Sequence, residues 1–456
     1  MTFLTTKEVA KEIGVHRDTL LRWLREGRIP EPDRDGRGWR RFSSNELYQL
    51  KDFSYRFQSP TSRTSQKTID HRLSELDWDF STSKTGYLTH NIHPYPAKFI
   101  PQIPNQLIQE LSCVGDTILD PFCGSGTTIL EALYLRRNAI GIDANPLACL
   151  ISRAKISRLQ ASEFEELEDL IAEVREMHIL LQSDQPNLFW ARDSEKMPAM
   201  LAAKDLDFWF SAEVQKELSF IKAKLQTLRS QAAYDVAATC FSAIIVGVSR
   251  QDSDTRYTRR DKTIVVGETL GRFADQLTRQ LPHLMEVEQL IQPDVEGTVI
   301  CADVLDSPEI PKANLIVTSP PYPNAYSYHL YHRTRMLWLD IDQADFKRRE
   351  IGSHRKYSSR SPNACTVETF RSEMLGIVRW LVANLESGGY LCFILGTSKI
   401  RGEIVRNDNL IIDCALECGL ELTSNLERNV HQGKKSFNPI NGRIKTENIV
   451  VLRKGS

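Results

Sequence analysis

TILDPFCGSGTTILEALYLRRNAIGIDANP, residues 117–146, decides the fold, because it reads as two apolar strands joined by a glycine loop and a helix. The first strand closes at Asp120, and Gly124 and Gly126 then permit positive φ and the close approach of a ligand to the backbone. Apolar residues at helical spacing follow the glycines. Asp143 ends the second strand about twenty residues later, where an acid can bind ribose hydroxyls. The stretch therefore predicts a βαβ unit that binds a nucleoside cofactor.

A second motif indicates the chemistry. Residues 314–326, NLIVTSPPYPNAY, form another apolar strand that ends in Ser-Pro-Pro-Tyr. Together the two motifs resemble the amino-group DNA methyltransferases, which bind S-adenosylmethionine at an FxGxG loop and place a (D/N/S)PP(Y/F) loop at the target base. Two motifs on one fold are far more specific than a lone glycine motif. The resemblance covers roughly residues 87–150 and 297–452.

The resemblance implies an α/β fold, a doubly wound seven-stranded methyltransferase sheet with an antiparallel edge. About 150 residues separate Asp143 from the next sheet strand, where a single crossover helix is enough, and this excess predicts an insertion. The predicted divisions are a winged helix-turn-helix domain at 1–53, a polar linker at 54–76, the cofactor half of the methyltransferase domain at 77–150, a mostly helical insertion and candidate target-recognition region at 151–296, and the catalytic half at 297–456.

The resemblance also implies which residues hold the cofactor, S-adenosylmethionine. In the family, a segment before the glycine loop packs across the methionine end, and a residue in the position of Asp303 holds the adenine amino group. Simpler interpretations are a proline-ordered loop that covers the sheet edge, and a strand that ends in an aspartate for solvation alone. The predicted set is His93, Tyr95, Pro96, Lys98, Asp120, Pro121, Phe122, Cys123, Gly124, Ser125, Gly126, Thr127, Asp143, Ala144 and Asp303.

The resemblance assigns catalysis to Ser319, Pro320, Pro321 and Tyr322. The exocyclic amine of a base is a poor nucleophile, because its lone pair is delocalised into the ring. If the Ser319 hydroxyl and the Pro320 carbonyl accept the two amine hydrogens, the lone pair can point at the sulfonium methyl. Tyr322 would then stack on a base flipped out of the duplex. The chain has no Pro-Cys nucleophile loop, so carbon methylation is not expected.

The motif leaves a choice between bases. A serine in the first position resembles the cytosine-N4 enzymes more than the adenine-N6 enzymes, which usually carry Asp or Asn there. The cofactor half precedes the catalytic half, however, and this order is commoner among adenine enzymes. We predict cytosine N4, with adenine N6 as the first alternative. An RNA guanine-N2 methyltransferase is the second alternative, and a transcription regulator that senses the cofactor is the third.

The N-terminus predicts a DNA-binding module. Residues 4–27 indicate two short helices with a turn at Gly14, and Ser43 with Glu46 forms a capping-box pattern for a third. This pattern resembles the winged helix-turn-helix of the MerR and excisionase group. A small helical module that binds protein, or that merely solvates its arginines, is the alternative. The resemblance implies DNA contacts from Arg17, Thr19, Arg22, Arg37, Arg40 and Arg41.

The insertion has two kinds of sequence. Long stretches have helical period and, with the aromatic core residues predicted at 208–210, favour a structural support. Its end, residues 249–260, is polar and rich in arginine, and there we predict nucleic-acid contact. The alternative is that these arginines pair with the aspartates beside them. The predicted contacts are Arg250, Arg256, Arg259 and Arg260.

Composition bounds the remaining expectations. The 456 residues carry a net charge of -1, so any surface that attracts DNA must be local. Nine cysteines occur without a CxxC pair, and the N-terminus has no apolar signal segment, which predicts a reduced cytoplasmic protein without a zinc or other metal site. No apolar run approaches the roughly 20 residues that span a bilayer. The expected partners are double-stranded DNA and a candidate cognate restriction nuclease, and no membrane is expected.

Overall fold

The computed structural model describes residues 4–13, 20–21, 24, 29, 31–36, 38–43, 46–47, 50, 68–81, 83–96, 98–182, 203–254, 256–321, 323, 327–351, 365–400, 403–430 and 446–455. The chain divides into two units, Met1–Lys67 with Gln109–Val114 and Thr68–Ile108 with Gly115–Ser456. The second unit holds both sequence motifs.

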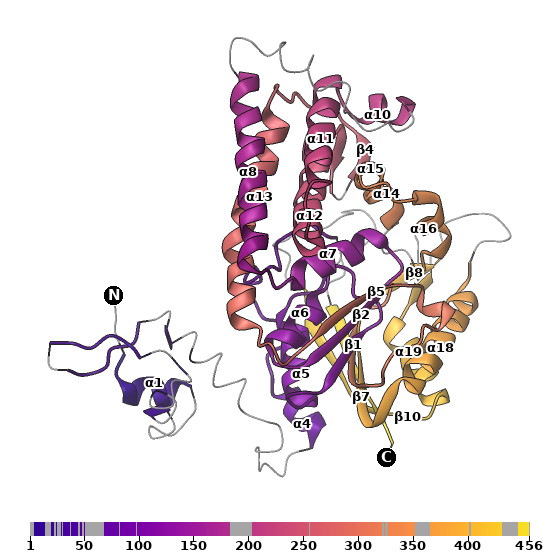
Figure 1. The fold of residues 1–456 in the computed structure, drawn as a ribbon. Helices are drawn as coiled ribbons and strands as arrows, with labels where there is room; N and C mark the ends of the chain where they lie inside the picture. Colours follow the sequence, from indigo (N-terminus) through magenta and orange to yellow (C-terminus); the bar gives the residue numbers. More distant parts are fainter. Residues whose placement is uncertain are drawn as a thin grey trace. The chain divides into compact units, whose positions relative to one another are not determined.

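A seven-stranded sheet forms the centre of this second unit (Figure 1). In spatial order its strands are β10 (Leu420–Asn429), β11 (Thr446–Lys454), β7 (Leu385–Gly396), β6 (Ala313–Thr318), β1 (Thr117–Asp120), β2 (Asn138–Asp143) and β5 (Gly297–Cys301). The five strands from β7 to β5 run parallel, while β11 is antiparallel to both of its neighbours. The predicted doubly wound sheet with an antiparallel pair at one edge is confirmed.

Two helices cover one face of the sheet. α18 (Val367–Ala383) and α19 (Asn407–Glu417) share a buried cluster with Leu119, Ile316 and Phe393 from three neighbouring strands. Residues on both sides of these parallel strands are buried, which explains why the strands read as continuous apolar runs rather than as alternating patterns.

The helices around the glycine loop lie on the other side of the sheet, as Figure 1 shows for α6 (Thr127–Tyr134) and α7 (Pro146–Ile156). Both helices contact β2. Because α7 continues to Ile156, the helical insertion begins after that residue rather than at 151. Further described helices are α4 (Ile69–Ser74), α5 (Gln102–Leu111), whose last three residues are grouped with the first unit, the 3-10 helix η3 (Val304–Asp306), α14 (Tyr328–Tyr331), α15 (Arg333–Trp338) and α16 (Gln343–Arg349).

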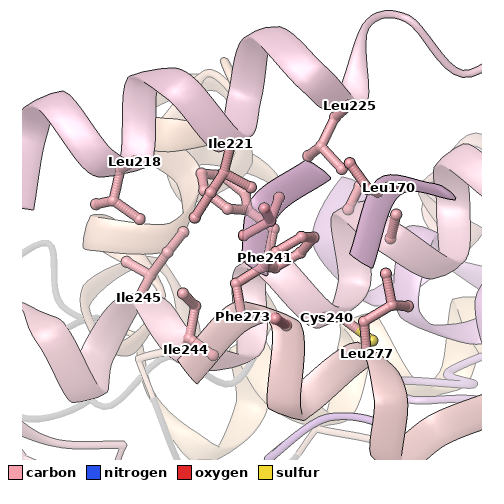
Figure 2. Close-up of a cluster of buried hydrophobic side chains, with 14 of the residues drawn as sticks. Leu170, Leu218, Ile221, Leu225, Cys240, Phe241, Ile244, Ile245, Phe273 and Leu277 are labelled. Atoms are coloured by element: carbon pink, nitrogen blue, oxygen red, sulfur yellow. The ribbon is translucent and has the colours of Figure 1, made fainter. Parts of the chain in front are cut away.

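The insertion is helical, as its period predicts. Figure 2 shows its apolar core, in which Phe241 and Phe273 meet edge to face with ring centroids 6.5 Å apart. Phe208, expected in an aromatic core with its two neighbours, is instead 45% exposed, while Trp209 and Phe210 are buried. The described helices of the insertion are α8 (Ala161–Gln182), α10 (Ala203–Trp209), α11 (Ala212–Leu225), α12 (Gln231–Val248) and α13 (Glu268–Leu290).

Two features of the second unit were not predicted. Two short antiparallel hairpins form small sheets separate from the main one: β3 (Gln251–Ser253) with β4 (Arg256–Arg259), and β8 (Ser398–Ile400) with β9 (Glu403–Val405). Among the described residues, α12 is also long and apolar enough to cross a membrane by length and composition, although we expected no such segment from the sequence. Of its 18 residues 72% are buried, and it packs inside the core of the insertion.

The first unit has its own small core. α1 (Thr6–Glu12) begins with a capping box between Thr5 and Glu8, and the predicted pair of Ser43 and Glu46 forms the reciprocal bonds of a second box. Gly14, the expected turn, lies outside the described residues. The cluster contains Val9, Ala10, Ile13, Leu20, Leu24, Ile29, Phe42 and Leu50.

The insertion core should contribute strongly to stability. Phe241→Ala removes a fully buried ring, and we expect a loss of about 3–5 kcal/mol in the free energy of unfolding, measured by chemical denaturation. The matched control is Ile179→Ala in α8, because that side chain is 66% exposed and should change stability by no more than about 0.5 kcal/mol. Equal effects of the two substitutions would contradict this packing.

Candidate active site

Three loops meet at the carboxyl edge of the sheet. β1 pairs in parallel with β6 on one side and with β2 on the other. The glycine loop after β1, the turn at Asp143 after β2 and the loop at Ser319 after β6 therefore leave the sheet side by side. Ligands bind at this edge in open α/β sheets.

The Asp120 carboxylate joins two of these loops. It accepts hydrogen bonds from the hydroxyl of Thr128 in α6 and from the hydroxyl of Thr318 in β6, both at 2.7 Å, and from the amide of Phe122 at 3.1 Å. Burial raises the pKa of Asp120 to about 6, while the three hydrogen bonds act in the opposite direction. One side chain thus fixes the start of the glycine loop relative to the start of the Ser319 loop.

Asp143, the last residue of β2, lies at the same edge of the sheet. Its two carboxylate oxygens accept the amides of Gly124 at 2.9 Å and of Asn145 at 2.8 Å. Burial raises its pKa to about 6, against the effect of these hydrogen bonds. A carboxylate offers about four lone-pair sites, so two amide donors leave acceptor capacity for the hydroxyls of a sugar.

The glycines are required by backbone geometry. Gly124 has φ of 51° and Gly126 has φ of 74°, in the left-handed region that other residues rarely adopt. A Cβ on Gly126 would also lie 2.9 Å from the Ser152 hydroxyl and 3.0 Å from the Ser152 Cα. Gly126 caps α6, so the helix begins where the loop ends.

The loops surround one pocket of about 1000 Å³, including space open to solvent, which is large enough for a nucleoside-sized cofactor. It combines apolar walls with a few polar groups, and the half-buried carboxylate of Asp143 lines it with acceptor capacity to spare, so these residues fit S-adenosylmethionine. Most predicted site residues line it: Tyr95, Pro96, Lys98, Pro121, Phe122, Cys123, Gly124, Ser125, Thr127, Asp143, Ala144, Asp303, Ser319, Pro320 and Pro321.

Some predicted residues do not line the pocket. Asp120 and Gly126 lie behind it, where they shape the loops. The prediction that His93 contacts the cofactor is corrected, because its buried ring bonds the Ser242 hydroxyl of the insertion at 3.0 Å instead. Burial and nearby positive charge lower the pKa of His93 well below its usual value. Tyr322 lies outside the described residues.

A buried carboxylate that the sequence did not reveal anchors the segment before the glycine loop. Glu131 in α6 is fully buried and receives hydrogen bonds from the Tyr87 hydroxyl, the His90 ring and the Asn105 amide, each at 2.6 Å. Burial lowers the pKa of His90 to about 4, so the ring is neutral at pH 7. These bonds hold in place the segment that carries Tyr95 into the pocket.

The pocket has further walls that sequence reasoning missed. Tyr328 stacks on Tyr95, with centroids 5.8 Å apart and planes 20° from parallel. Glu350 is almost fully buried and accepts a 2.6 Å hydrogen bond from the His329 ring. The only sequence signal for these residues is their position soon after the Ser-Pro-Pro-Tyr motif. The missed residues are Phe99, Asn145, Ala302, Val304, Tyr328, Phe346, Arg349, Glu350 and Ile351.

The Ser319 hydroxyl is oriented by the neighbouring strand. It donates its hydrogen to the carbonyl of Ile394 in β7 at 3.0 Å. A hydroxyl has one hydrogen and two lone pairs, so this donation leaves both lone pairs as acceptors. Pro320 and Pro321 follow in the pocket wall and have no amide hydrogen of their own to offer.

Comparison with known families agrees with this geometry. The DNA methylase family matches residues 28–153, a span that includes the glycine loop and Asp143. A methyltransferase domain described as RMKL-like matches residues 111–239. The MerR family of regulatory proteins matches residues 5–42.

The relatives include three proteins named Type II methyltransferases that match more than half of this chain. M.MjaII of Methanocaldococcus jannaschii is 25% identical, over 83% of this chain and 85% of the relative. M.MvaI of Kocuria varians is 27% identical, over 58% and 60%, and M.BsoBI of Geobacillus stearothermophilus is 25% identical, over 70% and 66%. The chain is an amino-group DNA methyltransferase. Its cofactor is S-adenosylmethionine.

The predicted DNA contacts of the methyltransferase fall into two groups. In the first unit, Arg40 pairs with Glu31 at 2.8 Å and Arg41 with Asp35 at 2.9 Å. In the insertion, the predicted arginines lie on and beside the β3–β4 hairpin and pair with aspartates there, as the alternative expected. The predicted major-groove residues Arg17, Thr19 and Arg22 and the wing residue Arg37 lie outside the described residues.

Asp143→Ala should weaken S-adenosylmethionine binding by about tenfold or more, because it removes a charge-assisted hydrogen bond of roughly 1.5–3 kcal/mol. Calorimetry measures the affinity directly. The control is Asp413→Ala, an exposed aspartate of α19. Unchanged binding in the Asp143 variant would remove this residue from the site.

Cofactor affinity should also depend on pH. The carboxyl of Asp143 is charged above its pKa of about 6 and becomes protonated as the pH falls through that value. Affinity is therefore expected to be highest above pH about 6 and to decline below it, since the charged form is the better acceptor for hydroxyls. In Asp143→Asn this decline should become shallower, with Asp120 left to titrate in the same range. An equally steep decline would assign the titration to another group.

Proposed function

We propose that the methyltransferase transfers a methyl group to the N4 amine of cytosine at specific sites in duplex DNA, with the target base flipped into the pocket. The observation that carries this proposal is the orientation of Ser319. Its hydroxyl hydrogen is held by Ile394, and its lone pairs are left for an amine in the same pocket as the cofactor loop.

The acceptor pair would act directly on the amine. S-adenosylmethionine, when bound, supplies an electrophilic methyl group. The Ser319 hydroxyl and the Pro320 carbonyl accept the two amine hydrogens, which moves the nitrogen toward tetrahedral geometry and frees its lone pair for in-line attack. The rigid prolines keep these acceptors in place. Asp120 holds this loop and the cofactor loop in a fixed relation, so donor and acceptor start aligned.

The choice of cytosine rests on the serine of the Ser-Pro-Pro-Tyr motif, which resembles the cytosine-N4 enzymes. One observation favours adenine N6 as the second candidate: the cofactor half precedes the catalytic half, with β1 before β6. Adenine also presents an amine with two hydrogens, so the same acceptor pair would serve it.

We also propose that the first unit binds duplex DNA and that the enzyme acts beside a cognate nuclease in restriction and modification. The match to MerR regulatory proteins at residues 5–42 and the small buried core support a helix-turn-helix module. The names of the Type II relatives support the pairing with a nuclease.

Ser319→Ala tests the acceptor role. Turnover, measured as transfer of labelled methyl groups to unmethylated genomic DNA, should fall by about tenfold or more, because the lost acceptor matters most as the amine becomes tetrahedral. Cofactor affinity should stay within about twofold. Ser162→Ala, an exposed serine of α8, is the control. Parallel losses of turnover and cofactor binding would show that Ser319 serves the cofactor instead.

A further inference from the structure

The β3–β4 hairpin carries a local excess of positive charge. Residues 250–262 contain five basic and three acidic side chains, in a chain whose net charge is -1. Arg256 and Arg260 are 65% and 74% exposed and share Asp252 at 3.6 and 3.4 Å. Both guanidinium groups keep most of their surface open to solvent, so they can contact phosphates while they remain beside the aspartate.

Aromatic rings hold other arginines of this surface in place. The Arg259 guanidinium lies 4.7 Å from the centroid of Phe208, the aromatic residue that proved exposed. Arg333 lies 5.1 Å from the ring of Trp209 and 5.9 Å from that of Tyr257. Stacked guanidinium groups lose less freedom on binding than free ones, which suits a surface that grips phosphates.

Two side chains of the hairpin, those of Gln251 and Asp254, contact the segment that follows the catalytic loop. Gln251 is fully buried, its amide donates to the Tyr331 carbonyl at 3.1 Å, and its carbonyl accepts the Thr334 hydroxyl at 3.1 Å. Arg335, also fully buried, pairs with Asp254 of the same hairpin. The hairpin is thus tied to both α14 and α15.

The short helix α14 carries this connection to the pocket. α14 runs from Tyr328, a pocket wall, to Tyr331, which Gln251 holds. Figure 1 shows β4, α15, α14 and α16 next to one another along one side of the second unit. A rigid link therefore joins the exposed arginines to the wall of the pocket.

We propose that the β3–β4 hairpin grips the phosphates of duplex DNA and positions the pocket wall for the target base. Arg256 and Arg260 contact phosphates, and Gln251 with Thr334 are positioning residues that hold α14 in the arrangement needed for turnover. The proposal rests on the proposed function, DNA amine methylation, and adds where the duplex lies and how its contact reaches the pocket.

The first part of the proposal, phosphate contact, is tested by DNA affinity and does not need a measurement of activity. Arg256→Ala/Arg260→Ala should reduce the slope of log affinity against log salt by about two for a duplex of arbitrary sequence, over roughly 50 to 200 mM salt, as expected for two lost phosphate contacts. Arg229→Ala is the matched control, because that arginine is 88% exposed in the same insertion but precedes α12, whereas the hairpin follows it, about 27 Å away along the helix. A slope that changes equally in both variants, or in neither, overturns the phosphate assignment.

The second part of the proposal, the positioning of α14, is tested with Thr334→Val. This substitution keeps the shape of a fully buried side chain and removes the hydroxyl that bonds Gln251. We expect kcat to fall about tenfold at saturating DNA, with the salt slope and cofactor affinity unchanged, and Thr334→Ser to restore most of the loss. Wild-type kcat in the valine variant, or equal losses in kcat, cofactor affinity and thermal stability, would overturn the role. If the unmodified enzyme methylated no DNA, the proposed function would fail while the salt-slope result still stood.

Discussion

The shared carboxylate of Asp120 is the constraint on which the active site depends. The cofactor loop and the catalytic loop lie far apart in the sequence, yet one buried side chain bonds the hydroxyls of Thr128 and Thr318 at 2.7 Å each. Keeping an anionic carboxylate in this position requires these donors, because burial raises the carboxyl's pKa and the value stands at about 6 even with the hydrogen bonds acting to lower it. Methyl transfer needs a donor and an acceptor in line, and this clamp fixes both loops before any ligand binds.

Local patterns predicted the sheet and most of the pocket. The glycine loop, Asp143 and the Ser319 loop were found because each sits directly after an apolar strand, and parallel topology brings the ends of such strands to one edge. The helices of the insertion followed from their period. Asp120 was expected to bind cofactor, and its structural position behind the pocket shows that a motif can mark a residue without revealing which neighbour it serves.

The rest depends on contacts between distant residues, which no local pattern encodes. His93 looked like a cofactor ligand until the structure placed Ser242, far along the chain, beside its ring. Tyr328 and Glu350 reach the pocket only because short helices fold back over it. Phe208 reads as core beside two buried aromatic residues, but it lies under Arg259 at the surface. The arginines near it were predicted from the sequence to contact nucleic acid, but Gln251, which links them to the pocket, carries no sequence signal.

The central claim is that a serine-led acceptor pair directs the methyl group to the amine of cytosine. Mass analysis of the nucleosides released from DNA treated with the purified enzyme and S-adenosylmethionine tests it most directly. The account predicts N4-methylcytosine as the product. N6-methyladenine with no N4-methylcytosine would contradict it and would show that the order of the two motifs, rather than the serine, indicates the base.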